Sequence, residues 1–325
     1  MSAKTLVRKQ SEVQPSLRVL GVYGYDDLEP VIWAALTSGD PLLLMGNAGT
    51  GKTYLLNSLA EALQLEHRHY NASLISFDDL VGFPYPSENY QSVSYLSTPA
   101  TVWKAQSILI DEINRCKPEH QNRLFSLIHE RRVQGISLDK LQYRWAAQNP
   151  PPDPEDPNAE IYEGVEALDP ALADRFAFLI EVPDWHQFSD TDKQLVTDPA
   201  GTGQISDDNG LLSAQVKEWQ KQFELLLQSP PAIVIDYACI VADQFKSVDI
   251  RLSPRRVRQI ARNLLALLVV SSDTSRKGVF LLALQSSIPQ TAYGDKIDLK
   301  TVRSVHNTAW TIVNGNEQDR WLAPF

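Results

Sequence analysis

The chain has 325 residues, of which 43% are hydrophobic and 22% charged, and its formal net charge is −10 at pH 7. These values are ordinary for a soluble globular protein, and a chain of this length is expected to form two domains. The negative charge argues against a surface that binds duplex nucleic acid, although a basic channel can occur in an acidic protein. Cys116 and Cys239 are the two cysteines, and they lack the spacing of a metal site or a disulfide framework.

Membrane and export signals are not found in the sequence. No apolar run reaches the length of a membrane span, and the first residues lack the apolar stretch of a signal peptide. We therefore expect a cytoplasmic protein without membrane contact. Residues 1–19 are polar and mixed in charge, which predicts a loose tail.

A phosphate-binding loop is the first informative motif in chain order. Residues 26–36 have helical spacing with Asp26 as a candidate N-cap, and four apolar residues at 42–45 then predict a buried strand. Residues 54–63 predict a helix. Between the strand and this helix the chain reads G-x-x-x-x-G-K-T, in the order Gly46, Asn47, Ala48, Gly49, Thr50, Gly51, Lys52 and Thr53. The order strand, glycine loop, helix disfavours a plain glycine turn and predicts a phosphate site.

The chemistry of this loop follows from its residue types. The glycines let backbone N–H groups surround phosphate oxygens, and the helix N-terminus adds partial positive charge. We expect Lys52 to contact the β- and γ-phosphates and the Thr53 hydroxyl to bind Mg²⁺. We also predict that Tyr54, the residue after the motif, is one of the cofactor-binding residues.

Residues 67–71 predict a second strand, in which His67 and His69 share one face. This spacing suits metal ligands, but a solvated strand face is favoured because no third ligand is apparent. Residues 82–102 are rich in Gly, Pro, Tyr and Ser and predict a long exposed loop, a kind that is usually functional or mobile.

An acidic pair follows the next predicted strand, at 107–110. Phosphoryl transfer requires a carboxylate that holds Mg²⁺ and a group that orients the attacking water. Asp111 fits the first requirement and Glu112 the second. The chain between Lys52 and this pair has room for another helix and strand, which strengthens the assignment.

The remaining pattern separates an α/β region from a helical one. In the first region we expect a helix at 118–131, a hairpin at 133–145 that leads into a strand ending at Gln148, a loop at 150–160, a short helix at 169–176 and a strand at 178–182. Residues 186–211 have the composition of a linker. Helices alone are expected afterwards, at 212–228, 231–246, 254–270, 276–287 and 298–314.

The segment Asp111–Arg115, taken with the phosphate loop, resembles AAA+ ATPases, and more narrowly the MoxR-like and dynein-related group, whose second helix carries an insert. The entry Gly24–Leu28, continued through Leu36 and Gly39, and the helix Gln121–Glu130 match the same group. The resemblance covers roughly residues 20–185. It implies an α/β P-loop NTPase core (αβα layers, a parallel five-stranded sheet) over 20–185, a linker over 186–211 and a small all-α lid domain over 212–325.

The same resemblance implies further working residues in the α/β region. Ala146–Pro150 matches the end of the sensor-1 strand, so Asn149 would help to position the attacking water; the alternative is a capping Asn before a proline turn. Leu168–Phe176 matches the segment with the arginine finger, so Arg175 would reach the γ-phosphate bound by the next subunit. The alternative is a salt bridge of Arg175 with Asp174 or Asp169.

Leu252–Arg256 resembles the sensor-2 start of a lid helix, with Ser253 as the cap and Pro254 in the first turn. Arg255 would then contact the nucleotide, with Arg256 as the alternative. Three departures leave the subfamily open: the loop between Asn149 and Arg175 is long, its segment Tyr162–Val165 is closer to dynein-related relatives, and Ser126 stands where a Glu is expected.

Residues 82–102 align with the helix-2 insert of the group. Its aromatic residues could line a central pore and grip a polypeptide, or could pack within their own loop: Phe83, Tyr85, Tyr90 and Tyr95. Neither alternative is preferred by the sequence.

The function implied by the resemblance is that of a Mg²⁺-dependent ATPase that forms a homo-oligomeric ring, expected to be a hexamer, and remodels a protein client, one candidate being a partner with a von Willebrand factor A domain. Each active site would combine Arg175 of one subunit with residues of its neighbour: Lys52, Thr53, Asp111, Glu112, Asn149 and Arg255.

Two functions of other classes remain as alternatives. One is a nucleic-acid motor or a defence or restriction NTPase, with GTP as a possible substrate, and the acidic net charge counts against it. The other is a nucleotide-gated scaffold with little turnover. The Asp111–Glu112 pair and Arg175 count against that alternative.

Overall fold

A five-stranded parallel sheet forms the centre of the protein. The computed structural model describes residues 15–88, 91, 93–116, 121, 124–151, 164–201, 208–271, 275–295 and 297–315. The strands lie in the order β2-β5-β8-β1-β9, and all neighbours are parallel. Their bounds are β1 Leu42–Met45, β2 His67–Asn71, β5 Ser107–Asp111, β8 Tyr143–Gln148 and β9 Phe178–Glu181. The predicted P-loop core is therefore confirmed.

Helices cover both faces of this sheet, so its central strands are buried. Leu42 and Leu44 of β1 point into one hydrophobic core, and the alternate residues Leu43 and Met45 point into a second. The first core is shared with α1 (Glu29–Ser38), α2 (Lys52–Ala62) and the C-terminal helices. The second is shared with α3 (Phe77–Val81), η4 (Ile113–Arg115), η5 (Ser126–Glu130, a π-helix) and α5 (Pro170–Ala173).

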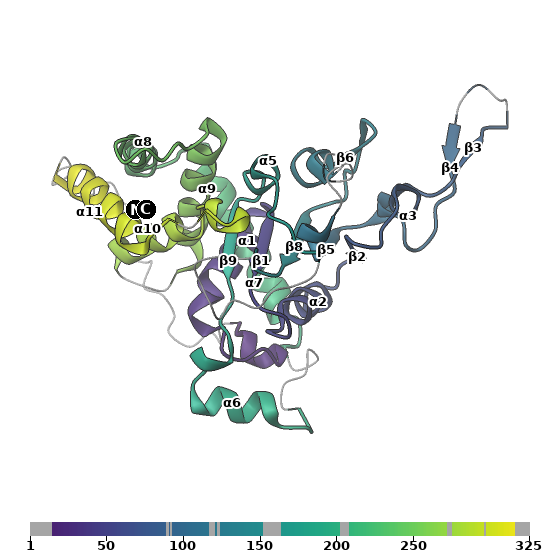
Figure 1. The fold of residues 1–325 in the computed structure, drawn as a ribbon, viewed down its shortest axis with the longest axis horizontal. Helices are drawn as coiled ribbons and strands as arrows, with labels where there is room; N and C mark the ends of the chain where they lie inside the picture. Colours follow the sequence, from purple (N-terminus) through teal and green to yellow (C-terminus); the bar gives the residue numbers. More distant parts are fainter. Residues whose placement is uncertain are drawn as a thin grey trace, which may run out of the picture.

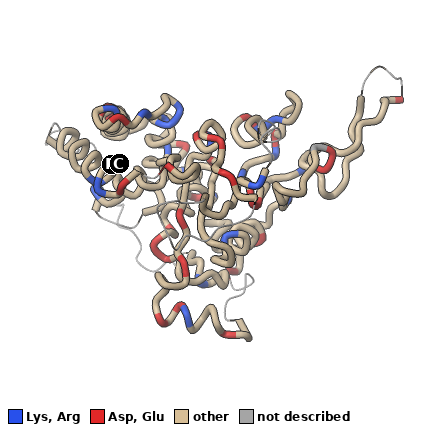
Figure 2. The backbone as a smooth tube through the Cα atoms, in the orientation of Figure 1, with Lys and Arg blue, Asp and Glu red and all other residues tan. Residues whose placement is uncertain are grey.

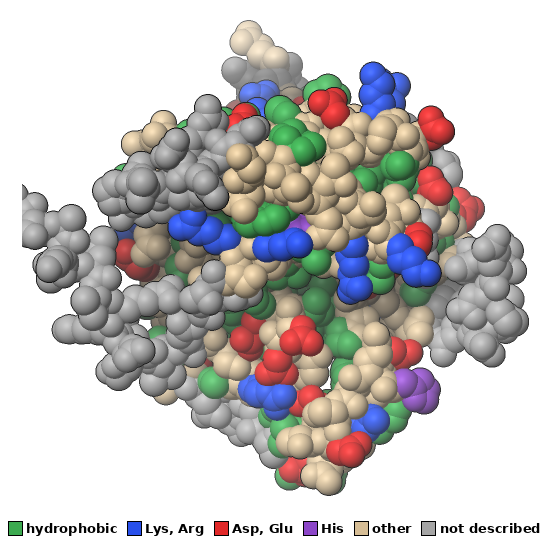
Figure 3. Space-filling view, turned by 90° about the vertical axis from the view of Figure 1, so that its left-hand side faces the viewer, with side chains coloured by type: hydrophobic (Ala, Val, Ile, Leu, Met, Phe, Trp, Pro, Cys, Tyr) green, Lys and Arg blue, Asp and Glu red, His purple; other side chains and the backbone are tan. Residues whose placement is uncertain are grey.

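In the described residues from 208 onwards, the regular elements are all helices, as predicted. They are α7 Leu211–Gln228, α8 Ala232–Lys246, α9 Pro254–Val270, α10 Arg276–Gln285, η8 Gln290–Tyr293 and α11 Leu299–Gly315. Helix α9 packs on α1 as well as on its neighbours α7, α8 and α10, so the first core continues from the sheet into this lid region (Figure 1). On the side of the molecule that faces left in Figure 1, Lys and Arg side chains form a band with acidic side chains below it (Figure 3).

The entry to the core differs from the sequence prediction. Residues 17–20 form the 3-10 helix η1, in which Leu17 and Leu20 are buried, so the tail predicted over 1–19 does not extend through these residues. Residues 1–14 lie outside the described residues. Asp26, in the 3-10 helix η2 (Asp26–Leu28), does not cap α1, because its carboxylate accepts hydrogen bonds from Arg18.

The stretch predicted as a linker contains folded structure. It begins within η6 (Trp185–Gln187) and includes α6 (Asp190–Thr197), whose N-cap is Ser189. Asp192 of α6 is buried and accepts from Arg18 at 2.7 Å, which ties this helix to the entry segment. The prediction was misled because Ser, Thr and Asp are common both in linkers and at helix caps.

The insert at 82–102 is a β-hairpin arm rather than an irregular loop. Strands β3 (Pro84–Pro86) and β4 (Val93–Tyr95) pair antiparallel, and the arm extends well away from the rest of the molecule (Figure 1). Its base carries the acidic residues of α3, whereas the strands carry no charge (Figure 2). The described residues also include two shorter elements: the 3-10 helix η3 (Val102–Lys104) and the hairpin of β6 (Arg132–Val133) with β7 (Ile136–Ser137).

Two predicted segments are only partly tested. In the helix expected at 118–131, residues 118–120 and 122–123 lie outside the described residues. The same holds for residues 152–160 of the loop expected at 150–160, and for Tyr162.

His67 in β2 makes stability sensitive to acid. Its ring nitrogens lie 2.8 Å from Ser107 Oγ and 3.1 Å from Asn57 Oδ1, and burial lowers its pKa to about 4. The unfolded chain takes up a proton near pH 6.5 but the native state does not, so stability falls as the pH drops from there towards 4. We expect this to cost about 2 kcal/mol, measured as the difference in unfolding free energy by urea denaturation at pH 7 and pH 4.5.

His67→Gln removes this titration and should show a smaller difference between the two pH values than the wild type. His186→Gln serves as the control, because His186 is exposed in η6. An unchanged pH dependence in His67→Gln would contradict the assignment.

Candidate functional site

The loop Gly46–Thr53 follows β1 at the carboxyl edge of the sheet and has the backbone of a phosphate-binding loop. Gly49 and Gly51 have φ angles of 79° and 92°, in the left-handed region that residues with side chains avoid. At Gly46 the constraint is spatial, because a Cβ atom there would lie 2.4 Å from Val182. Tyr25 Oη donates to the carbonyl of Thr50 at 2.8 Å and fixes the outer part of the loop.

Lys52 is a buried cation whose hydrogen-bond partners are uncharged oxygens. Its side chain is 7% exposed, and Nζ donates to the carbonyls of Gly46 and Asn47, both at 2.7 Å, and to Asn149 Oδ1 at 3.3 Å. Burial lowers the pKa of Lys52 to about 8, although Asp111 and Glu112 oppose this shift. An ammonium group desolvated in this way is stabilised by an anion, so the loop fits a polyphosphate.

Thr53 and Asp111 meet beside the loop. Thr53 Oγ1 donates to Asp111 Oδ2 at 2.8 Å, and the N–H of Glu112 donates to Asp111 Oδ1 at 2.9 Å. Burial alone would raise the pKa of Asp111, but hydrogen bonds from His69, Thr53 and the Glu112 N–H lower it overall. An ionised carboxylate beside a hydroxyl is the hard oxygen donor set that Mg²⁺ prefers, so these residues fit the expected cation.

Glu112 is held by two partners that the sequence did not identify. Asn71 Nδ2 donates to one carboxylate oxygen at 3.1 Å, and Arg115 Nη1 lies 3.3 Å from the other. The backbone of Glu112 has φ 52°, in the left-handed region. Asn71 could have been found from its position, because it ends β2 and pairs in register with Asp111 on the neighbouring strand.

Asn149 follows β8 and joins the same site. Its side chain accepts from Lys52, and its carbonyl accepts from Asn114 Nδ2 at 2.9 Å. Asn114 is buried and therefore sets the backbone position of Asn149. The structure thus brings together five of the predicted site residues: Lys52, Thr53, Asp111, Glu112 and Asn149.

A cavity of about 470 Å³ opens beside the phosphate loop. Aromatic residues from the entry segment, from α2 and from the stretch at η6 line it: Tyr23, Tyr25, Tyr54, Trp185 and Phe188. Asn47 Nδ2 donates to Asp184 Oδ2 at 2.9 Å and so ties the loop to this wall. A cavity of this size and lining suits a nucleoside. Of its aromatic residues, only Tyr54 was predicted.

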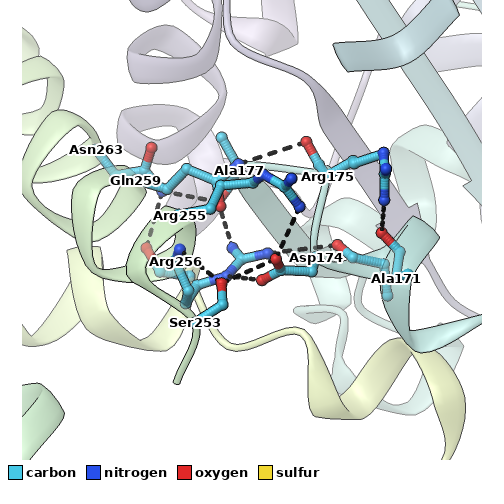
Figure 4. Close-up of polar contacts among 11 residues, drawn as sticks. Ala171, Asp174, Arg175, Ala177, Ser253, Arg255, Arg256, Gln259 and Asn263 are labelled. Carbon is cyan, nitrogen blue, oxygen red and sulfur yellow. Dashed lines mark hydrogen bonds and ion pairs between the residues drawn. The ribbon is translucent and has the colours of Figure 1, made fainter. Parts of the chain in front are cut away.

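Arg175 and Arg255 lie at the opposite edge of the sheet. The residues just before β9 are joined to those just before β1, since the N–H of Ala177 donates to the carbonyl of Pro41 at 2.9 Å. Both strands run parallel, and β1 spans about 13 Å between this amino edge and the phosphate loop. The amino edge also holds Asp174, which accepts from Ser253 Oγ and from the guanidinium groups of Arg255 and Arg256 (Figure 4).

This arrangement corrects the expected place of Arg255. The sequence grouped Arg255 with Lys52 of the same chain, whereas the structure places it beside Asp174, 3.1 Å away, at the amino edge. The reason is that Ser253 and Arg256 anchor the start of α9 to the turn between α5 and β9 (Figure 4). Arg256 is completely buried and also donates to the carbonyls of Ala173 and Ala177, so it is structural, whereas Arg255 is 38% exposed.

Arg175 does not form the salt bridge with Asp174 or Asp169 that was the alternative to an arginine finger. Its guanidinium donates to the carbonyl of Ala171 and lies 4.1 Å from the ring centre of Phe125. Asp174 pairs with the lid arginines instead, and Asp169 caps α5. In the part of the chain that the structure describes, Arg175 forms no ion pair.

Two further properties of the described residues bear on the predictions. Among the described residues, no group of three or more His, Cys, Asp and Glu side chains could hold a metal ion. In the same residues no single helix is long and apolar enough to span a membrane, and only the bent pair of α7 and α8 meets that test.

Comparisons with known proteins agree with this geometry. A family model described as AAA domain (dynein-related subfamily) matches residues 41–176. The crystal structure of a candidate ATPase from Cytophaga hutchinsonii is similar with a TM-score of 0.56 and 17% sequence identity, over 89% of this chain and 90% of that chain. The comparison with curated proteins found no match. Residues 41–176 therefore match the AAA domain of the dynein-related subfamily, and the fold is that of an AAA+ core with αβα layers followed by a helical lid.

Proposed function

We propose that this protein is a Mg²⁺-dependent enzyme that converts ATP and water into ADP and phosphate, in a ring whose active sites lie between subunits. One observation carries the proposal. The phosphate loop with Asp111 and Glu112 lies at one edge of the sheet, whereas Arg175 and Arg255 lie at the other. One chain therefore does not bring both halves of the expected site together.

The residues at the carboxyl edge suit hydrolysis. Lys52 offers its charge to the phosphates, and Glu112 can orient and activate the attacking water once Asn71 and Arg115 release it. Asn149 is tied to Lys52 and can help to place that water. When bound, Mg²⁺ would be held by Thr53 and Asp111 and would supply charge neutralisation on the phosphates. The aromatic cavity would hold the base and ribose.

The residues at the amino edge suit a neighbouring subunit. Arg175 is partly buried and its guanidinium lies against Phe125, and Arg255 is held by Asp174. A head-to-tail contact that places this edge against the carboxyl edge of the next copy would complete each site. Repetition of such a contact closes a ring, for which six subunits is our expectation.

The hairpin arm supports a protein client. Phe83 and Tyr85 are 63% and 48% exposed, as expected of residues that contact a polypeptide. Tyr95 instead packs on Trp103, with ring centres 5.9 Å apart, and Tyr90 lies outside the described residues. We therefore assign client contact to the first two residues. A protein with a von Willebrand factor A domain, the client that the resemblance to MoxR-like ATPases implies, is the first to test, and the cytoplasm is the expected compartment.

Nucleotide binding tests the carboxyl half of this proposal. ATP should quench tryptophan fluorescence, because Trp185 lines the cavity beside the loop. Lys52→Ala should weaken ATP affinity about 100-fold, since it removes charge-assisted hydrogen bonds to phosphate. Lys104→Ala, which changes an exposed lysine in η3, is the matched control.

The same titration separates the alternatives. Tighter binding of GTP than of ATP would favour the GTP-using class, and equal ATP affinity in Lys52→Ala and the wild type would contradict the assignment of the loop. A change in turnover on addition of DNA or RNA that weakens with salt would favour the nucleic-acid motor.

A further inference from the structure

We propose that His69 is a positioning residue for the divalent cation: it donates Nε2–H to Asp111 and holds this carboxylate against the Thr53 hydroxyl. The inference rests on the proposed function, because it takes the Asp111–Thr53 pair as the cation site. It adds to that site a side chain from the edge strand β2, which neither the motif nor the family match assigns.

The register of the sheet brings His69 to the site. Strand β2 pairs with β5 so that Asn71 lies opposite Asp111 and His69 lies opposite Leu109. His69 and Asn71 share one face of β2, because they are two residues apart. From this position Nε2 of His69 reaches to 3.4 Å from Asp111 Oδ2, the same oxygen that accepts from Thr53 at 2.8 Å.

Three elements therefore fix one carboxylate. Thr53 of α2 and His69 of β2 contact Oδ2, and the N–H of Glu112 contacts Oδ1. Strand β2 also supplies Asn71 to Glu112, so it provides one partner for each member of the acidic pair. Groups that orient a metal-binding side chain commonly change metal affinity 10- to 100-fold when they are removed.

The contrast with His67 separates positioning from structural support. His67 uses both ring nitrogens on Ser107 and Asn57, and burial lowers its pKa. The side chain of His69 is 38% exposed, so its contact with Asp111 contributes little to folding. Its Nε2 nevertheless lies 3.4 Å from the carboxylate of the expected cation site.

The experiment measures cation affinity rather than turnover. A non-hydrolysable ATP analogue is bound to the full chain, and free Mg²⁺ is titrated while tryptophan fluorescence reports formation of the ternary complex. His69→Leu should raise the half-saturating Mg²⁺ concentration about tenfold. His69→Gln should stay near the wild type, because its amide can still donate to Asp111.

Controls keep the result specific. Glu66→Gln, next to β2 and exposed, should behave as the wild type, and affinity for the analogue without Mg²⁺ should be equal in all variants. His69→Thr, with a short side chain that strands favour, replaces the Leu variant if that variant does not fold. Thermal melting checks the fold of each variant.

Three results would overturn the inference while the proposed function stands: unchanged Mg²⁺ affinity in both His69→Leu and His69→Thr, an equal loss in the Leu and Gln variants, or a ¹⁴N coupling of Mn²⁺ in the wild type. The last would show that imidazole ligates the cation directly. A wild type that binds the analogue equally with and without Mg²⁺ would overturn the cation site itself, and with it the proposed function.

Discussion

Glu112→Gln is expected to slow ATP hydrolysis by a factor of about 10²–10⁴ while ATP affinity stays near that of the wild type. Glutamine has the shape of glutamate, and its carbonyl can still accept from Asn71. It has no negative charge and cannot accept the proton of the attacking water. The variant should therefore accumulate in its ATP-bound form.

Phosphate release under saturating ATP measures the rate, and tryptophan fluorescence measures the affinity. Glu61→Gln, an exposed position on α2, is the matched control. Hydrolysis at the wild-type rate in Glu112→Gln would show that another group activates the water. If ATP affinity fell together with the rate, Glu112 would be needed for ATP binding at the phosphate loop rather than for activation of the water. The trapped form is also the one in which to identify a co-purifying client.

Arg175→Ala is expected to lower turnover about 10³-fold in the assembled protein and to leave ATP binding by the isolated subunit unchanged. ATP binding by the isolated subunit should be unchanged because Arg175 lies at the amino edge of the sheet, away from the phosphate loop of its own chain. Turnover should fall in the assembled protein because a neighbour would bind its nucleotide against this edge, where the Arg175 guanidinium would offset charge that develops on the γ-phosphate.

A mixing experiment gives this prediction its strongest form. Lys52→Ala and Arg175→Ala subunits should each be inactive alone, and their co-assembled mixture should regain turnover, because some interfaces then pair an intact loop with an intact arginine. Arg303→Ala, an exposed change on α11, should be active alone. No recovery in mixtures that do co-assemble would place Arg175 outside the shared site.

Local sequence signals predicted the elements whose causes are local. The apolar run Leu42–Met45 and the glycine loop after it gave β1 and the start of α2, and the acidic pair marked the end of β5. The lid helices followed from periodicity, and α9 starts at Pro254 with Ser253 as its N-cap, as predicted. These features depend on hydrophobic spacing, caps and turn geometry within a few residues.

Non-local contacts decided the features that were predicted wrongly. Asp26 could have capped a helix, but Arg18 takes its carboxylate. The same arginine holds Asp192, which fixes α6 where the composition indicated a linker. In the insert, β3 and β4 pair with each other although the sequence has no strong local signal for a hairpin. In each of these cases a partner that is distant in the chain sets the local conformation.

The sequence by itself determined the αβα fold, the phosphate loop, and the Asp111–Glu112 carboxylates at the end of β5. Only the tertiary structure placed Asn71 and His69 beside Glu112 and Asp111, because parallel register is set by packing across strands. It also decided that Arg255 lies with Arg175 at the opposite edge, because Asp174, Ser253 and the buried Arg256 anchor the lid there. Which edge a residue occupies depends on how separate segments pack, and no motif within a single segment contains that information.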